Sequence, residues 1–219
     1  MKYEAILFDM DGVLIDSEEL MTKAGIMALH DFGIEAKPED FIPFVGRGED
    51  LYIGGVAEKY GHKYVTAMKD SAYAHYGDHV ETEAFVPPEI PAILYTLRDL
   101  GYKIAVCTSA DKVKVVHNLR AMGVTEDVFT AIVTGDRIKN KKPDPEIYLT
   151  GAALAGVEPE KCAVVEDAPS GIKAAQAAGM LAVGIDTSFP AEHLMQISHP
   201  DRMIHSLNEL PGLLEKMNA

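Results

Sequence analysis

Five short apolar runs, each followed by a polar residue or a glycine, constrain the fold of this chain more than any other feature. They are AILF at 5–8, KIAVC at 103–107, AIVT at 131–134, AVV at 163–165 and LAVGI at 181–185. A weaker sixth run is MIH at 203–205. Unbroken runs of this kind, without polar alternation, indicate strands buried on both faces, as in a parallel sheet.

Helical patterns lie between the runs. Residues 89–100 place a stripe of apolar side chains on one helix face, and Gly101 then provides a stop signal. The stripe consists of Ile90, Ile93, Leu94 and Leu97. Residues 112–122, 144–155 and 170–179 are predicted to form helices in the same way. Alternating strands and helices predict a doubly wound, Rossmann-like α/β sheet with right-handed crossovers.

One segment breaks this alternation. Residues 17–84 have helical patterning and no convincing buried strand. Asp16 is predicted to cap the first helix, with Glu19 reaching back to it. An apolar stripe follows at Leu20, Ala24, Met27 and Ala28. We therefore expect residues 17–84 to form an inserted helical cap domain, and residues 1–16 and 85–219 to form the α/β core.

Acidic and hydroxyl side chains follow the predicted strands. They are Asp9 and Asp11, then Thr108 and Ser109, then Glu166 and Asp167, and Lys142 comes shortly after the third run. The carboxyl ends of parallel strands lie at one edge of the sheet, where ligands of open α/β folds bind. The sequence thus predicts that four carboxylates converge at one site.

Such a site needs positive charge. Each pair of carboxylates about 4 Å apart costs roughly 4 kcal/mol at an effective dielectric near 20, which a single lysine does not offset. Oxygen ligands favour Mg²⁺ over zinc or copper. We therefore expect a Mg²⁺ cofactor, which would also let a phosphate dianion approach a carboxylate nucleophile.

Four ordered motifs, FDMDGVLIDSE, CTSA, KKPDPEIY and VVEDAPSGIKAAQAAG, resemble those of the haloacid dehalogenase superfamily. They are similar to the branch with a helical cap that holds β-phosphoglucomutase and many sugar-phosphate phosphatases. The resemblance implies that Asp9 is the nucleophile that forms an aspartyl-phosphate. It implies that Asp11 is the general acid and base, and we expect acidic neighbours and cap closure to raise its pKa.

The same resemblance assigns the remaining polar residues. Ser109, with Thr108 behind it, is expected to bind a phosphate oxygen, and Lys142 to neutralise charge on the nucleophile and phosphate. Lys141 is the rival for that role, as a neighbour in the same basic run.

The resemblance also implies the metal ligands. Asp167, Asp9 and the backbone carbonyl of Asp11 are expected to hold Mg²⁺, and Glu166 to support them in the metal shell. A calcium loop of the D-x-D type is rejected, because its glycine and glutamate positions hold Leu14 and Leu20 here.

Two cap residues, Arg47 and Lys69, are predicted to contact the substrate, and the loop 45–50 to select it. A small phosphorylated metabolite such as a sugar phosphate is the expected substrate.

The preferred function is a phosphatase. A phosphomutase remains open, although the position of the mutase's cap histidine holds Met21. A phosphonatase and a non-enzymatic module that binds a phosphorylated metabolite are further alternatives, and the complete motif set favours an enzyme.

Charge and cysteine content bear on partners and location. The formal net charge of −14 argues against binding nucleic acid or an anionic membrane surface. Cys107 and Cys162 lie in apolar runs and are predicted to be buried, reduced thiols. The first residues have no signal-peptide character, and no apolar stretch has the length of a membrane span. We therefore expect a cytoplasmic protein, and the resemblance to cap-bearing relatives of this size implies a monomer.

Overall fold

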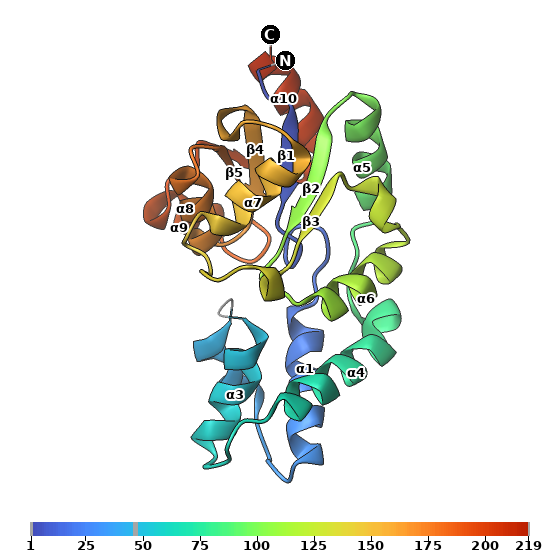
Figure 1. Cartoon of the computed structure of the whole chain (residues 1–219), viewed down its shortest axis with the longest axis vertical. Helices are drawn as coiled ribbons and strands as arrows, with labels where there is room; N and C mark the ends of the chain where they lie inside the picture. Colours follow the sequence, from blue (N-terminus) through green and yellow to red (C-terminus); the bar gives the residue numbers. More distant parts are fainter. Residues whose placement is uncertain (1, 46–47, 219) are drawn as a thin grey trace.

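The computed structural model describes residues 2–45 and 48–218 and contains one six-stranded sheet (Figure 1). The strands are β1 (Ala5–Phe8), β2 (Lys103–Cys107), β3 (Ala131–Val133), β4 (Cys162–Glu166), β5 (Leu181–Ile185) and β6 (Arg202–Ile204). All neighbours are parallel, in the order β3-β2-β1-β4-β5-β6. The predicted doubly wound sheet is confirmed, and the weak run near 203 is its edge strand.

Helices cover both faces of this sheet, which is why its central strands are apolar throughout. Leu7 packs in one core with α7 (Glu146–Ala155), α8 (Pro169–Ala177) and α9 (Ala191–Ile197). Ile6 and Phe8 point into the opposite core, with α5 (Ile90–Asp99), α6 (Lys112–Met122) and α10 (Leu210–Asn218). Because successive residues of a strand face opposite ways, each β1 residue is buried.

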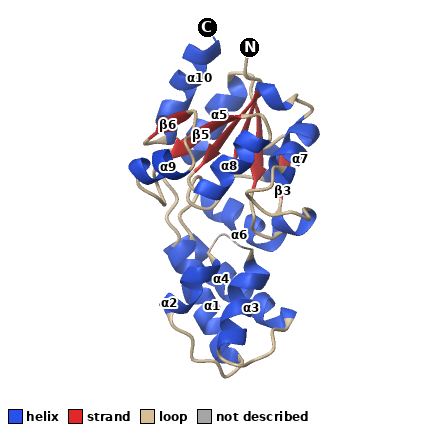
Figure 2. Cartoon of the chain, turned by 90° about the vertical axis from the view of Figure 1, so that its left-hand side faces the viewer, coloured by secondary structure: helices blue, strands red, loops and turns tan. Residues whose placement is uncertain are grey.

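Four α-helices of the described residues lie beyond the carboxyl ends of the strands and form what we call the helical segment, between residues 18 and 83 (Figures 1 and 2). They are α1 (Glu18–Asp31), α2 (Pro38–Phe41), α3 (Glu49–Lys59) and α4 (Thr66–Glu83). Asp16 and Phe85 pair through two backbone hydrogen bonds of 2.8 and 3.0 Å, so both connections to the sheet lie side by side. The division into a core and a cap domain at 17–84 stays a prediction.

The start of α1 differs from the prediction. The helix begins at Glu18 with Ser17 at its N-cap, so Asp16 is not the cap. Met27 is 40% exposed and does not belong to the buried stripe. The stripe instead contains Leu20, Met21, Ala24, Ala28 and Leu29. Helix α1 packs closely on α4, and that contact selects a face rotated from the expected one.

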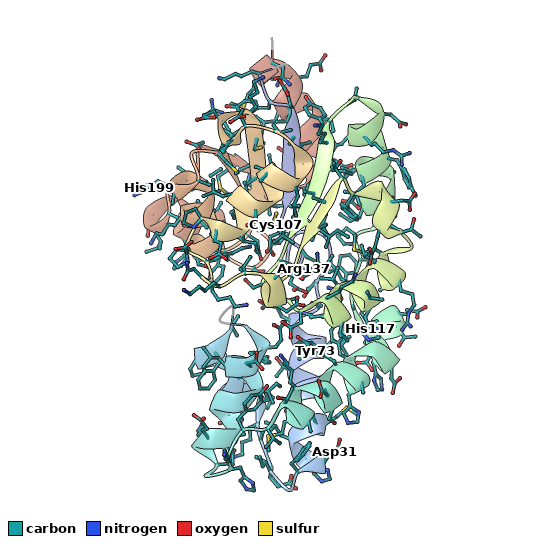
Figure 3. The ribbon with its side chains drawn as sticks, viewed as in Figure 1. Asp31, Tyr73, Cys107, His117, Arg137 and His199 are labelled. Carbon is teal, nitrogen blue, oxygen red and sulfur yellow. The ribbon has the colours of Figure 1, made fainter. Side chains whose placement is uncertain are left out.

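Both cysteines are free and buried in strands, as predicted, and Figure 3 labels Cys107 within the sheet. Among the helices of the described residues, none combines the length and apolar character needed to cross a membrane.

Candidate active site

A cavity of about 420 Å³ lies between the carboxyl edge of the sheet and the helical segment. The sheet side contributes Asp9, Asp11, Thr108, Ser109, Lys142, Glu166 and Asp167. The helical segment and α6 contribute Glu18, Met21, Thr22, Glu49, Tyr52 and Lys114. Strand order reverses between β1 and β4, so the cavity opens where doubly wound folds bind ligands.

Lys142 joins two of the carboxylates. Its ammonium lies 2.5 Å from Asp9 Oδ1 and 2.5 Å from Glu166 Oε1, and the side chain is almost fully buried. Lys141 points elsewhere and donates to the Gly135 carbonyl at 2.6 Å. Of the two lysines, Lys142 is therefore the one that reaches Asp9.

Glu166 is committed to protein partners. Tyr148 donates to Oε1 at 2.9 Å, and the Ala168 amide donates to Oε2 at 2.9 Å, in addition to the contact with Lys142. A Cβ at Gly171 would lie 1.7 Å from Oε1, so α8 approaches this carboxylate at a distance only glycine permits. With both oxygens occupied, Glu166 orients Lys142, and this arrangement does not favour direct coordination of a metal.

Asp9 and Asp167 are the two carboxylates at the sheet edge whose pKa is raised. Burial, with a contribution from nearby Glu166, raises the pKa of Asp9 to about 7 despite Lys142. Burial and the charges of Glu166 and Asp9 raise the pKa of Asp167 well above its ordinary value. Two buried carboxylates that resist ionisation in each other's presence indicate a place for a cation.

The predicted metal ligands can be tested against this geometry. Within residues 2–45 and 48–218 no three Asp, Glu, His or Cys side chains converge as a metal site. The expected set needs only two carboxylates, Asp9 and Asp167, with the backbone carbonyl of Asp11. Gly12 has φ +83°, and a Cβ there would lie 1.9 Å from Asp167 Oδ2. The turn after Asp9 thus packs directly on Asp167, and an all-oxygen donor set fits Mg²⁺.

Asp11 is held as a carboxylate. Lys114 lies 2.9 Å from Oδ1, Ser17 donates to the same oxygen at 2.5 Å, and Asn118 donates at 3.3 Å. Burial pushes the pKa of Asp11 up, but Lys114 and these donors hold it below the ordinary value. The expectation of a raised pKa for Asp11 was wrong, because the cation of α6 was not anticipated.

The lysine that faces Asp11 belongs to a network with the helical segment. Lys114 lies 5.4 Å from the centre of the Tyr76 ring, and Tyr76 donates to Asn118 Oδ1 at 2.5 Å. Lys114, Tyr76 and Asn118 are all buried.

Thr108 and Ser109 follow β2 and line the cavity, as expected. The Thr108 hydroxyl accepts a hydrogen bond from the Ala110 amide at 3.1 Å, which leaves its proton available to another acceptor. A Cβ at Gly135 would lie 1.9 Å from the Ser109 carbonyl, so this turn is fixed against the loop after β3.

The structure does not place the two predicted cap contacts, Arg47 and Lys69, in the cavity with the core residues. Lys69 pairs with Asp111 at 2.7 Å and with Asp50 at 3.0 Å, and it is not among the described residues that line the cavity. This geometry gives no support to a substrate contact by Lys69, because its charge is already neutralised. Arg47 lies outside the described residues. Of the loop predicted to select substrate, Val45, Gly48 and Glu49 line the cavity.

Sequence reasoning did not identify Lys114, Asn118 or Glu49 as individual site residues. Lys114 and Asn118 are one helical turn apart in α6, the helix that follows Thr108 and Ser109. This spacing, next to a strand end already assigned to the site, is the signal that could have found them.

A parallel α/β sheet with acidic side chains after its first strand and a lysine beside them is the arrangement of one class of phosphoryl-transfer enzymes. The chain belongs to the haloacid dehalogenase-like hydrolase family, whose profile matches residues 6–185. The description of this family makes the chain an enzyme of the hydrolase type.

Three relatives illustrate the similarity. The chain is 38% identical over 194 residues to the Arabidopsis thaliana protein SUPPRESSOR OF QUENCHING 1, chloroplastic, covering 85% of the chain but 18% of that much longer protein. It is 26% identical to pyrophosphatase PpaX of Bacillus cereus, over 100% of the chain and 99% of the relative. A solved structure of a candidate β-phosphoglucomutase from Thermotoga maritima is 27% identical, with a TM-score of 0.76, and covers 97% of this chain and 99% of its own.

Proposed function

We propose that the protein is a Mg²⁺-dependent phosphatase that hydrolyses a small phosphorylated metabolite, such as a sugar phosphate, through an aspartyl-phosphate at Asp9. The observation that carries the proposal is the contact of buried Asp9 with Lys142, at 2.5 Å, in a cavity that also holds Asp167. The lysine keeps a carboxylate available for attack and attracts a phosphate dianion.

In the first half-reaction, an Asp9 oxygen forms a bond to phosphorus as the bond from phosphorus to the ester oxygen breaks. The departing alkoxide takes a proton from Asp11, which must first have bound one. In the second half-reaction, Asp11 accepts a proton from water as that water attacks phosphorus. The bond from phosphorus to Asp9 then breaks and releases inorganic phosphate. In this structure Lys114, Ser17 and Asn118 all contact Asp11 Oδ1 and favour the ionised carboxylate, which is the form that suits the second step.

Other groups hold the phosphoryl oxygens. The Ser109 and Thr108 hydroxyls and the Lys142 ammonium line the cavity beside Asp9, so they are available as donors. Asp9, Asp167 and the Asp11 carbonyl would hold Mg²⁺. When bound, the ion would neutralise the two carboxylates and the transferring phosphoryl group.

The helical segment supplies the other wall of the cavity, and we infer that it acts as a cap that excludes water during the reaction. The paired backbone segments at Asp16 and Phe85 are the place for a hinge. Arg47 as a substrate contact, a monomeric state and a cytoplasmic location stay predictions.

A phosphomutase is a second candidate, because the 27% identical structure from Thermotoga maritima is described as a candidate β-phosphoglucomutase. Met21 lines the cavity where the resemblance places a mutase histidine, and its thioether carries no transferable proton. This observation favours hydrolysis.

The test is a panel of phosphate monoesters, together with pyrophosphate because of the relative of that name. Released phosphate is measured with Mg²⁺ and with a chelator, and again with a sugar bisphosphate as activator. Hydrolysis that requires Mg²⁺ supports the phosphatase. Isomerisation of a sugar phosphate without net phosphate release would identify a mutase, and binding without turnover would identify a regulatory module.

A further inference from the structure

The side of the cavity opposite Asp9 carries an acidic residue with an unused acceptor. Glu49 is the first residue of α3, and its Oε2 atom is buried with no hydrogen-bond partner among the described residues. A buried carboxylate oxygen without a donor is costly, and a ligand that supplies the donor removes that cost. The residue lines the same cavity as Asp9.

The two hydroxyls that line the cavity with Glu49 are already hydrogen-bonded within the helical segment. We call Glu18, Thr22, Glu49, Tyr52 and Lys114 the distal wall. The single Thr22 hydroxyl proton goes to the Glu18 carbonyl at 3.0 Å. The Tyr52 hydroxyl therefore donates to Thr22 Oγ1 at 2.7 Å, and its own oxygen remains an acceptor. Glu49 and Tyr52 thus both present acceptors to a ligand.

The charges on this side of the cavity also disfavour a negatively charged ligand. Lys114 and Lys142 are the cations among the described lining residues, and each is already paired with a carboxylate. Lys114 faces Asp11, so the carboxylates of Glu18 and Glu49 have no cation of their own at contact distance in the part of the chain the structure describes. Burial, opposed by Lys114, raises the pKa of Glu49 to about 7, and a second anion beside it would be repelled or would force it to bind a proton.

From this wall we infer that the leaving group of the substrate is an uncharged or cationic alcohol that donates a hydrogen bond to Glu49. By the same reasoning, Glu49 discriminates against leaving groups that carry a carboxylate or a second phosphate. The inference rests on the proposed phosphatase function and narrows its substrate class to phosphorylated polyols and amino alcohols.

Two pairs of compounds isolate this effect, since each pair differs only by a terminal hydroxymethyl group in place of a carboxylate. They are glycerol 3-phosphate with 3-phosphoglycerate, and glucitol 6-phosphate with 6-phosphogluconate. Each compound is assayed as a substrate and as a competitive inhibitor of p-nitrophenyl phosphate hydrolysis in the presence of Mg²⁺. The wild-type enzyme should favour the alcohol of each pair by on the order of tenfold or more, in kcat/KM or in inhibition constant.

The variant Glu49→Gln removes the charge, and we expect it to reduce the alcohol-to-acid ratio by on the order of tenfold. Glu58→Gln, an exposed residue of the same helix, is the matched control and should keep the wild-type ratio. If Glu49→Gln does not fold, Glu49→Asp keeps the charge but shortens the side chain. This variant should bind the alcohols more weakly than the wild type does and should still exclude the acids.

The outcomes separate the two proposals. Equal or better binding of the acids by the wild type, no inhibition by either alcohol, or an unchanged ratio in Glu49→Gln would overturn the inference. With p-nitrophenyl phosphate still hydrolysed, the phosphatase proposal would survive that result. If no phosphate ester, including p-nitrophenyl phosphate, is hydrolysed, both proposals fail together.

Discussion

Replacing Gly12 by alanine tests the packing of the turn after Asp9 against Asp167. The new Cβ would lie 1.9 Å from Asp167 Oδ2 and 2.6 Å from Ser188 Oγ. Ordinary contact begins at 3.4 Å, so the carboxylate oxygen must withdraw by about 1.5 Å. Metal–ligand distances tolerate changes of only about 0.2 Å. We expect the Mg²⁺ concentration for half-maximal activity to rise by about 10–100-fold.

The same substitution also strains the backbone. Gly12 has φ +83°, where a side chain costs about 1–2 kcal/mol. For a chain of this size the strain lowers the melting temperature by about 2–8 °C. Gly123→Ala is the matched control, because Gly123 has φ +66° and no atom lies within 4 Å of its Cβ position. It should reproduce the strain without the effect on Mg²⁺.

The assay combines thermal unfolding of both variants with Mg²⁺ titrations of p-nitrophenyl phosphate hydrolysis. Gly12→Ala should require more Mg²⁺ than the wild type, and Gly123→Ala should not. If Gly12→Ala and Gly123→Ala have the same Mg²⁺ dependence, the carboxylate that packs against Gly12 is not a metal ligand.

Two further predictions concern the charged groups of the cavity. The folded-state pKa of Asp9 is raised from 3.8 to about 7, and that of Asp167 is raised as well, so the metal-free protein should lose stability as the pH rises between these values. The gain in melting temperature on adding Mg²⁺ should accordingly be larger at pH 8 than at pH 5, and an equal gain would contradict the metal site. Lys114→Met leaves the Asp11 carboxylate without its cation, so the pKa of Asp11 should rise and the protein should lose on the order of 3 kcal/mol of stability. The pH at which activity rises as Asp11 loses its proton should therefore be higher in the variant than in the wild type. A pH profile identical to that of the wild type would show that Lys114 does not act on Asp11.

Much of the fold follows from local sequence patterns. The uninterrupted apolar runs predicted all six strands, because a strand buried on both faces leaves no place for polar side chains. The stripe of α5 predicted its buried face, Ile90, Ile93, Leu94 and Leu97. The first turn of α1 was misassigned, since Ser17 rather than Asp16 is its N-cap residue, and the Ser17 hydroxyl donates to Asp11.

The site was less predictable than the sheet, because its details depend on contacts between distant segments. The strand-end position of Asp9 and Asp167 followed from the topology, and the structure brings both to one cavity. The ionisation of Asp11 did not follow, since it depends on Lys114, a residue whose burial is decided by how α4 packs on α6. The sequence likewise does not reveal that Lys69 is paired, because Asp111 and Asp50, which neutralise it, lie far from it along the chain.

The central claim is that Asp9 attacks phosphorus, and the most direct measurement is identification of the phosphorylated residue. The enzyme is mixed with Mg²⁺ and a phosphate ester, quenched in acid within the turnover time, digested and analysed by mass spectrometry. The account predicts one phosphoryl group on the peptide that contains Asp9, and neither label nor turnover in Asp9→Asn. Phosphorylation of another residue, or full activity of Asp9→Asn, would contradict it.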